Sequence, residues 1–256
     1  MKSLIAFIKK ELLEQIRTGK VMILGALFVL FGIMNPAIAK LTPWLLETLT
    51  DSLAESGMIV TEVTVNALDS WVQFFKNIPM ALIAYVLIES SIFTKEYQSG
   101  TLLLSLTKGF ERYKVVLSKT IVLSLLWTVG YWMCFGITYA YNTYFWDNSI
   151  AQHLILSVVC WWLFGMWVIA LLILCSTIMN TNAGVLMGTG SVVLISYVLG
   201  FLPKIKPYVP TSLTNGTVLI YGVTTADTYF IPLILVVIMC VICFITSILL
   251  FNKKLI

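Results

Sequence analysis

Long stretches without a charged residue run through this sequence and constrain its fold more than any other feature. Positions 21–39 carry no charge, and His153 is the only ionisable residue between Asp147 and Lys204. A helix needs about 20 apolar residues to cross the hydrocarbon layer of a membrane. Charged residues make up only 11% of the 256, whereas soluble chains carry about 25%. The sequence therefore predicts an all-α polytopic membrane protein and excludes a soluble globular domain.

The apolar stretches divide into six predicted spans. Their ranges are about 21–39, 77–93, 120–146, 154–178, 185–202 and 229–251. The stretch after Asp147 is too long for one crossing, so we place a turn at its polar, glycine-containing positions 179–184. Pro36 should bend or end the first span. Residues 37–39 (Ala-Ile-Ala) also resemble a signal-peptidase site, but the apolar run before them is longer than a signal peptide needs, so we expect a retained span.

Three segments outside the spans have features of their own. Residues 2–18 repeat an apolar side chain every four positions, with charged residues off that stripe, which predicts an amphipathic helix in the membrane interface. Segment 40–76 suggests two short amphipathic helices, broken around residues 56–57, on the opposite side. Segment 203–228 is rich in Pro, Gly and Thr, and we expect part of it to dip back into the membrane against protein.

The basic residues give the orientation. Six spans place both termini on one side, and 12 of the 16 Lys and Arg residues fall there; the other four are Lys40, Lys76, Lys204 and Lys206. Lys and Arg accumulate on the cytoplasmic side of membrane proteins. We therefore expect both termini in the cytoplasm, and segments 40–76 and 203–228 outside.

The longest polar interruption on the predicted cytoplasmic side is loop 94–119. Gly100 and Thr101 lead into a leucine-rich turn at 102–106, which we interpret as a short helix that ends at 108–109. Exposed leucines flanked by charges are typical of a docking element for another protein. The same segment could also rest on lipid headgroups, which its basic residues would favour.

The sequence has no recognisable catalytic constellation. It lacks a metalloprotease motif, a pair of intramembrane aspartates and a phosphate-binding loop of the form GxxxxGK[ST]. The five cysteines lie in apolar runs and the single histidine lies at the mouth of a span, so we expect no metal site and no disulfide. We predict no catalytic residue, and no cofactor in this chain.

Two features inside the membrane could contribute to a substrate path or a gate. Glu89 is the only carboxylate within a predicted span, near its inner end, where it could face water or pair with Lys95. Four aromatic residues of the third span share one helical face because they are spaced four apart: Trp127, Tyr131, Phe135 and Tyr139. Such a face could contact an amphipathic substrate, but packing and an interfacial aromatic belt are the favoured explanations.

Nearly the whole chain resembles the type-2 permease subunits of ABC exporters. The resemblance lies in the basic N-terminal helix, the six spans with both termini inside, and a first cytoplasmic loop of the form E-x-x-x-G-T-L. It implies contact with an ATPase subunit through the N-terminal helix and this loop. The residues to which it assigns this coupling are Glu11, Arg17, Glu96, Gly100, Thr101, Leu102, Leu103, Arg112 and Lys119.

The resemblance also implies partners and a location. It predicts two permease copies, identical or paralogous, each docked on a cytoplasmic ATPase that binds ATP and Mg²⁺, in a bacterial plasma membrane. We expect export of an amphipathic or hydrophobic cargo, such as a peptide, an antibiotic or a drug. The alternatives are ABC-driven sodium extrusion, a six-span enzyme or channel that is not coupled to ATP, and a membrane anchor or sensor subunit that transports nothing.

Overall fold

A computed structural model of the chain describes residues 2–48, 64–101, 107 and 111–254. Within these ranges the regular structure is entirely helical. The longer helices are α1 (Lys2–Arg17), α2 (Lys20–Thr48), α4 (Ala67–Glu89), α5 (Ser91–Ser99), α7 (Arg112–Phe145), α8 (Leu154–Ile178), α9 (Asn182–Gly200) and α11 (Phe230–Lys253). Six helical stretches of the described chain are long and apolar enough to cross a membrane, as the sequence predicts.

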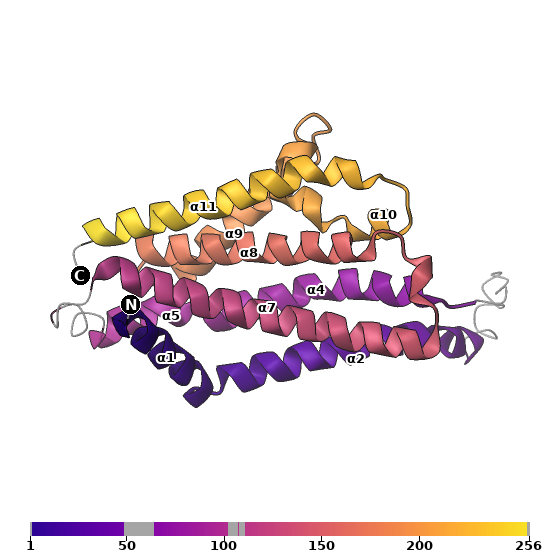
Figure 1. Ribbon diagram of the computed structural model, residues 1–256, viewed down its shortest axis with the longest axis horizontal. Coiled ribbons are helices and arrows are strands. Elements are labelled where there is room, and N and C mark those ends of the chain that lie inside the picture. The colour runs from indigo at the N-terminus through magenta and orange to yellow at the C-terminus, as the bar shows by residue number, and fades with distance from the viewer. Residues whose placement is uncertain (1, 49–63, 102–106, 108–110, 255–256) are drawn as a thin grey trace.

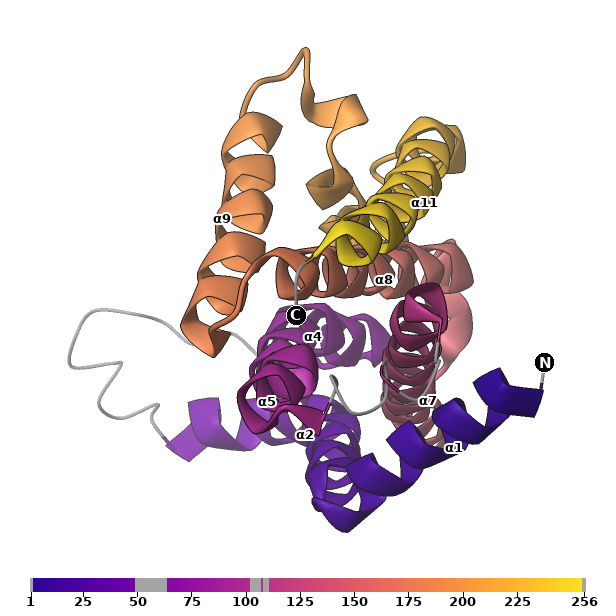
Figure 2. The ribbon, with the colours of Figure 1, turned by 90° about the vertical axis from the view of Figure 1, so that its left-hand side faces the viewer.

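The spans form one elongated bundle in which both termini lie at the same end (Figure 1). We call this the proximal end and the opposite one the distal end. Helix α1 does not continue the line of α2 but turns across the proximal end beside α7 (Figure 2). Gly19 makes this corner with a positive φ of 74°, a conformation that glycine adopts without steric cost. The predicted interfacial helix 2–18 is therefore a separate helix, as expected.

The first span is longer than predicted. Helix α2 passes through both Pro36 and Pro43 and ends at Thr48. Pro36 therefore does not end the span near residue 39, and that part of the expectation is wrong. A proline removes one backbone hydrogen bond, but neighbouring helices offset this loss inside a packed membrane bundle. Here α2 packs along α4 and α7. Of the segment in which two short surface helices are predicted, residues 40–48 continue α2 instead, and residues 49–63 lie outside the described residues.

The second span also begins earlier than predicted, at Ala67 rather than at 77. Asn66 starts α4 with a capping box: its side chain accepts from the Leu68 amide, and the Asp69 carboxylate accepts from the Asn66 amide. The following turns bury Trp71 and Phe74 completely. Their burial explains why this charged stretch belongs to the bundle and not to a surface segment. Residues 91–99 then form α5 after a break at Ser90.

The remaining spans follow the prediction more closely. Helix α8 covers 154–178 as predicted, and the turn at 179–184 is confirmed, although α9 begins within it at Asn182. Helix α7 begins eight residues before the predicted start of the third span. Most of α8 is buried inside the bundle, whereas α9 and α11 are mostly exposed. Helix α8 is therefore the central helix of the fold.

Close helix packing depends on two glycines that face aromatic rings. A Cβ atom added at Gly130 of α7 would lie 2.4 Å from the Phe28 ring of α2, and one at Gly165 of α8 would lie 2.3 Å from the Trp127 indole of α7. Real Cβ atoms do not approach this closely, so only glycine fits at either position. These contacts lock α7 between α2 and α8.

The segment from 201 to 229 folds back onto the spans through short 3₁₀ turns and helix α10 (Gly216–Ile220). The Trp161 indole donates to the carbonyl of Thr214 at 2.9 Å, and the Tyr229 hydroxyl donates to the carbonyl of Asn215 at 3.0 Å. Gly216 lies against the Phe75 ring of α4. The middle of the segment, residues 209–220, is thus packed against protein, which is the condition that a membrane-dipping segment requires, whereas residues 201–208 are exposed.

Candidate functional site

Four charged side chains at the proximal end form what we call the ion-pair cluster: Lys10, Glu11, Glu96 and Lys119. The Lys119 ammonium of α7 lies 2.9 Å from the Glu11 carboxylate of α1 and 3.0 Å from the Glu96 carboxylate of α5. Lys10 of α1 lies 3.0 Å from Glu11 and 2.6 Å from Glu96. Two ammonium groups thus alternate with two carboxylates, and the cluster as a whole is neutral.

Three of the four members of the cluster are buried from solvent. Lys119, Glu11 and Glu96 expose 1%, 2% and 5% of their surface. The Lys119 ammonium donates hydrogen bonds to the Glu11 carboxylate at 2.9 Å and to the Ile92 carbonyl at 3.0 Å. Removing one partner of such a buried pair is strongly destabilising, because the other charge is left without compensation. The cluster therefore holds α1, α5 and α7 together in one geometry.

Lys10 is the partly exposed member and closes the cluster toward solvent. Burial of its ammonium group favours the neutral form, but hydrogen bonds and charge attraction to Glu96 and Glu11 outweigh this and raise its pKa. The carboxylates of Glu11, Glu14 and Glu96 lie within 4.8 Å of one another, a spacing that could hold a metal ion. The Lys10 ammonium lies 3.4 Å from Glu14 as well as close to the other two, so it occupies that position itself.

The buried face of α1 was not apparent from its sequence. Phe7, Glu11 and Gln15 are its buried residues, whereas Ile16 of the predicted apolar stripe is 55% exposed. Phe7, Glu11 and Gln15 are also spaced four apart. This four-residue spacing indicates one buried helical face. Because two of the three residues are polar, a search for apolar faces does not find it.

Glu89 lies beside the ion-pair cluster, at the end of α4, and is fully buried. One of its oxygens accepts from the Gln15 amide at 2.7 Å and lies 3.4 Å from the Lys20 ammonium. The hypothesis that Glu89 faces water or pairs with Lys95 is therefore wrong. Lys95 is exposed, and the α1–α2 corner brings Gln15 and Lys20 against Glu89 instead. Neither partner was predicted from the sequence.

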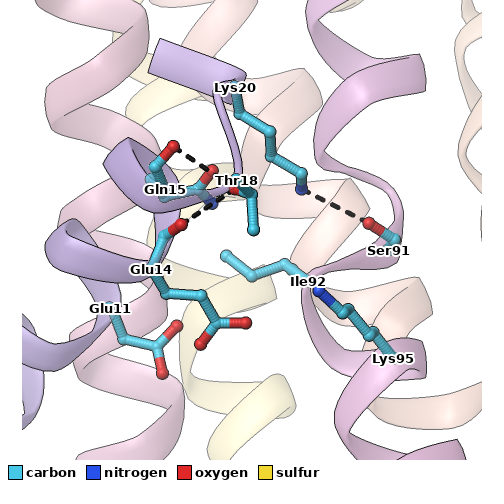
Figure 3. A pocket seen from close by; sticks show the side chains of 8 residues that line it. All are labelled: Glu11, Glu14, Gln15, Thr18, Lys20, Ser91, Ile92 and Lys95. Carbon is cyan, nitrogen blue, oxygen red and sulfur yellow. Dashed lines mark hydrogen bonds between the residues drawn. The ribbon is translucent and has the colours of Figure 1, made fainter.

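A small cavity lies between α1, the start of α2 and α5 (Figure 3). Its volume is about 20 Å³, which is enough for a single water molecule. Lys20 reaches across it from α2 to Ser91 of α5, with 3.3 Å between the ammonium and the hydroxyl. The α1–α2 corner is thus tied to α5 by Lys20 in addition to the ion-pair cluster.

The other predicted coupling residues lie apart from the cluster. Arg17 is exposed at the end of α1. Arg112 donates to the backbone carbonyls of Phe251, in the last turn of α11, and of Lys254, just after it. Gly100 ends α5 with a left-handed φ of 67°, and exposed Thr101 follows it. Leu102 and Leu103 lie outside the described residues. The structure thus brings Glu11, Glu96 and Lys119 together, but not Arg17 or Arg112.

The aromatic face of α7 serves mainly to pack the bundle. Trp127 and Tyr131 are fully buried and donate to the carbonyls of Trp162 at 3.2 Å and Val158 at 2.7 Å on α8. These two rings therefore do not line an open cleft, contrary to one hypothesis above, because α8 fills the space beside them. Phe135 is partly buried against Trp71, and Tyr139 is 43% exposed.

An apolar groove of about 360 Å³ runs between α4, α8 and α9. Its walls include Leu82, Val86, Trp161, Phe164, Val193 and Tyr197. No sequence pattern marks this groove, because its lining comes from three helices whose apolar residues are typical of any span.

Comparison with known proteins gives the family. The family model described as "ABC-2 family transporter protein" matches residues 5–255. The comparison with curated proteins gave no match. The match to the family model includes α1, the proximal ion-pair cluster and all six candidate spans. This chain belongs to the ABC-2 family of transporter proteins.

Proposed function

We propose that this chain is the transmembrane permease subunit of an ATP-driven exporter, and that a separate ATPase subunit supplies the energy. The observation that carries the proposal is the buried ion-pair cluster, which joins the crosswise helix α1 to α5 and α7 at one end of the bundle. Family membership supports it. The sequence also lacks a phosphate-binding loop of its own, which fits an ATPase site on another chain.

The cluster gives the proposed coupling a physical basis. A force applied to α1, or to the loop after α5, acts on charges that cannot separate without leaving a buried charge unpaired. The three helices therefore move as one body. Helix α7 is 34 residues long and extends to the distal end, so a displacement at the cluster is carried across the membrane.

The proposed docking surface for the ATPase is the proximal end. Arg17 and Lys9 are exposed on α1, and Gly100 and Thr101 begin the loop toward Leu102 and Leu103. The excess of Lys and Arg at this end supports a cytoplasmic location in a bacterial plasma membrane. In this arrangement ATP and Mg²⁺ bind to the ATPase, and a second permease copy or paralogue completes the transporter.

The proposed cargo is amphipathic or hydrophobic, such as a peptide, an antibiotic or a drug. The apolar groove between α4, α8 and α9 supports this, since most ligand sites are concave and largely apolar. Sodium extrusion receives less support. The buried carboxylates Glu11, Glu89 and Glu96 each lie within ion-pair distance of a lysine, so internal ammonium groups occupy the positions next to these oxygens.

Purification of the chain from native membranes tests the proposal. We expect a stable complex with an ATPase subunit whose ATP hydrolysis is inhibited by vanadate and rises on reconstitution with the permease. A chain that transports substrate without such a partner would contradict it, as would a co-purified ATPase whose activity the permease does not change.

The role of the ion-pair cluster is tested by Glu96→Gln in that complex. We expect a fall in permease-stimulated ATP hydrolysis of about tenfold or more, because the amide keeps the shape of the side chain but loses the charge attraction to Lys10 and Lys119. Glu111→Gln is the matched control, since Glu111 is an exposed acid in the same loop. Equal activity of the two variants at equal assembly would exclude the coupling role.

A further inference from the structure

The first residue after α11, Lys254, joins three helices at the proximal end. Its ammonium donates to the carbonyl of Thr177 at 2.9 Å and lies 3.5 Å from that of Ile178, the last two residues of α8. The last carbonyls of a helix have no partner within the helix and carry the negative end of its dipole. Lys254 thus caps the C-terminal end of α8 with a positive charge.

The same ammonium group also contacts α5. It lies 4.1 Å from the centre of the Tyr97 ring, within the range of a cation–π interaction. Tyr97 is adjacent to Glu96 of the ion-pair cluster. Helix α5 therefore contacts α1 and α7 through Glu96, and the ends of α8 and α11 through Tyr97 and Lys254.

Two further contacts connect α5 with α11 and α9. Phe93 of α5 packs edge-on against Phe251 of α11, with 5.8 Å between the ring centres. The Thr94 hydroxyl donates to the Asn182 side chain at the start of α9 at 2.5 Å. These contacts lie on the same side of α5 as Tyr97, so they reinforce the link that Lys254 makes.

Arg112 fixes the backbone that presents Lys254. Its guanidinium, at the first residue of α7, donates to the carbonyls of Phe251, at 3.3 Å, and Lys254. The neighbouring Lys253 differs, because its side chain is exposed. Lys254 is only partly exposed, and burial lowers its pKa. The two adjacent lysines thus have different surroundings, which provides a matched pair for experiment.

We propose that Lys254 is a positioning residue that ties α8 and α11 to α5, so that a movement imposed on the ion-pair cluster reaches the fourth and sixth spans. This inference rests on the proposed function, because it extends ATPase coupling beyond the N-terminal helix and the loop after α5. It assigns Arg112 a supporting role: Arg112 holds Lys254 in place and does not itself contact the ATPase.

The first test uses the full chain alone in lipid nanodiscs and measures amide hydrogen exchange. In Lys254→Met we expect exchange about tenfold faster in α5 and in the last turn of α8, because a hydrogen bond from a charged donor and a ring contact are lost. Lys253→Met should match the wild type, and Lys254→Arg should restore most of the protection. Equal exchange in Lys254→Met and Lys253→Met would overturn the proposal.

The second test uses the complex with its co-purified ATPase, trapped with ATP and vanadate. We expect trapping to change exchange in α1 and α5 of every variant. The change in α8 should appear in wild type, Lys253→Met and Lys254→Arg, but be lost in Lys254→Met. A role of Lys254 in stability alone would leave this response intact, and that result would overturn the proposal.

The two tests also separate the inference from the proposed function. If trapping changes nothing in the wild-type complex, ATP-driven coupling is contradicted. The first test still decides whether Lys254 ties α5 to α8. If wild type responds and Lys254→Met responds equally in α8, the proposed function stands and the role of Lys254 is excluded.

Discussion

At the scale of single residues, the geometry of the proximal end depends on a few charges. Lys119 is 1% exposed and lies against two carboxylates from two other helices. A methionine at this position would fill similar space but leave Glu11 and Glu96 without their buried partner. We expect Lys119→Met to lower the free energy of unfolding by about 3–5 kcal/mol.

Thermal unfolding in detergent checks this prediction. Lys114→Met is the control, because Lys114 pairs with Glu111 on the exposed side of the same helix start. We expect little change there, since exposed ion pairs contribute little to stability. If both variants lost the same stability, the burial of Lys119 would not explain the loss of stability in Lys119→Met.

The raised pKa of Lys10 makes a prediction about pH. A group whose pKa is raised on folding contributes stability that is fully present below its ordinary pKa and is lost only as the pH rises through the folded value. Since the ordinary lysine value is about 10.5, the contribution of Lys10 should stay constant between about pH 6 and about pH 9. The difference in melting temperature between wild type and Lys10→Met measures it, and a difference that shrinks over this range would contradict the assignment.

The residue scale also shows what the sequence could reveal about the site. Glu11, Glu96 and Lys119 were found through the family resemblance. Lys10, Gln15, Lys20 and Lys254 were not, because their partners lie on other helices and no local pattern marks such pairs. Glu89 was recognised as a buried carboxylate, but its partner was assigned to the nearest lysine in sequence and proved to be on another helix.

At the scale of elements, α5 depends on how it ends. Gly100 has a φ of 67°, and a Cβ added there would meet no atom within 4 Å. Gly100→Ala should therefore destabilise the end of α5 through backbone conformation alone, by about 1–2 kcal/mol. Gly100→Asn should cost less, since asparagine tolerates the left-handed region.

Hydrogen exchange of α5, together with thermal unfolding, measures this effect. Gly136→Ala in α7 is the control, because it lies within a helix and also has open space around its Cβ position. We expect that change to be neutral or slightly stabilising. Equal destabilisation at both glycines would show that the left-handed conformation of Gly100 is not responsible.

The element scale shows where sequence reasoning holds and where it fails. Helix α8 was predicted to the residue because its run is uniformly apolar and bounded by clear turn residues. The beginning of α4 was missed because Asp69 and Lys76 suggested a surface segment, although Trp71 and Phe74 of the same turns are buried. In the sequence, the charged residue of a capping box that starts a helix cannot be told from a charge that ends a span. The packing partners seen in the structure distinguish the two.

At the scale of the whole molecule, the bundle makes a prediction about topology. Both termini lie at the proximal end, and the positive charge excess predicts that this end is cytoplasmic. We expect fluorescent-protein fusions at either terminus to fluoresce, and an alkaline phosphatase fusion after Lys204 to be active. An active phosphatase at either terminus would reverse the orientation.

The central position of α8 has a consequence for how the protein is made. The first three spans leave the ribosome before α8. Until α8 inserts, the Trp127 indole of α7 has no Gly165 against which to pack. The surface of α7 that α8 later covers then faces lipid. A nascent chain at this stage is incomplete and open to quality-control proteases. The rate at which the protein reaches its folded state should therefore depend on the insertion of its fourth span, however early the first three spans insert into the membrane.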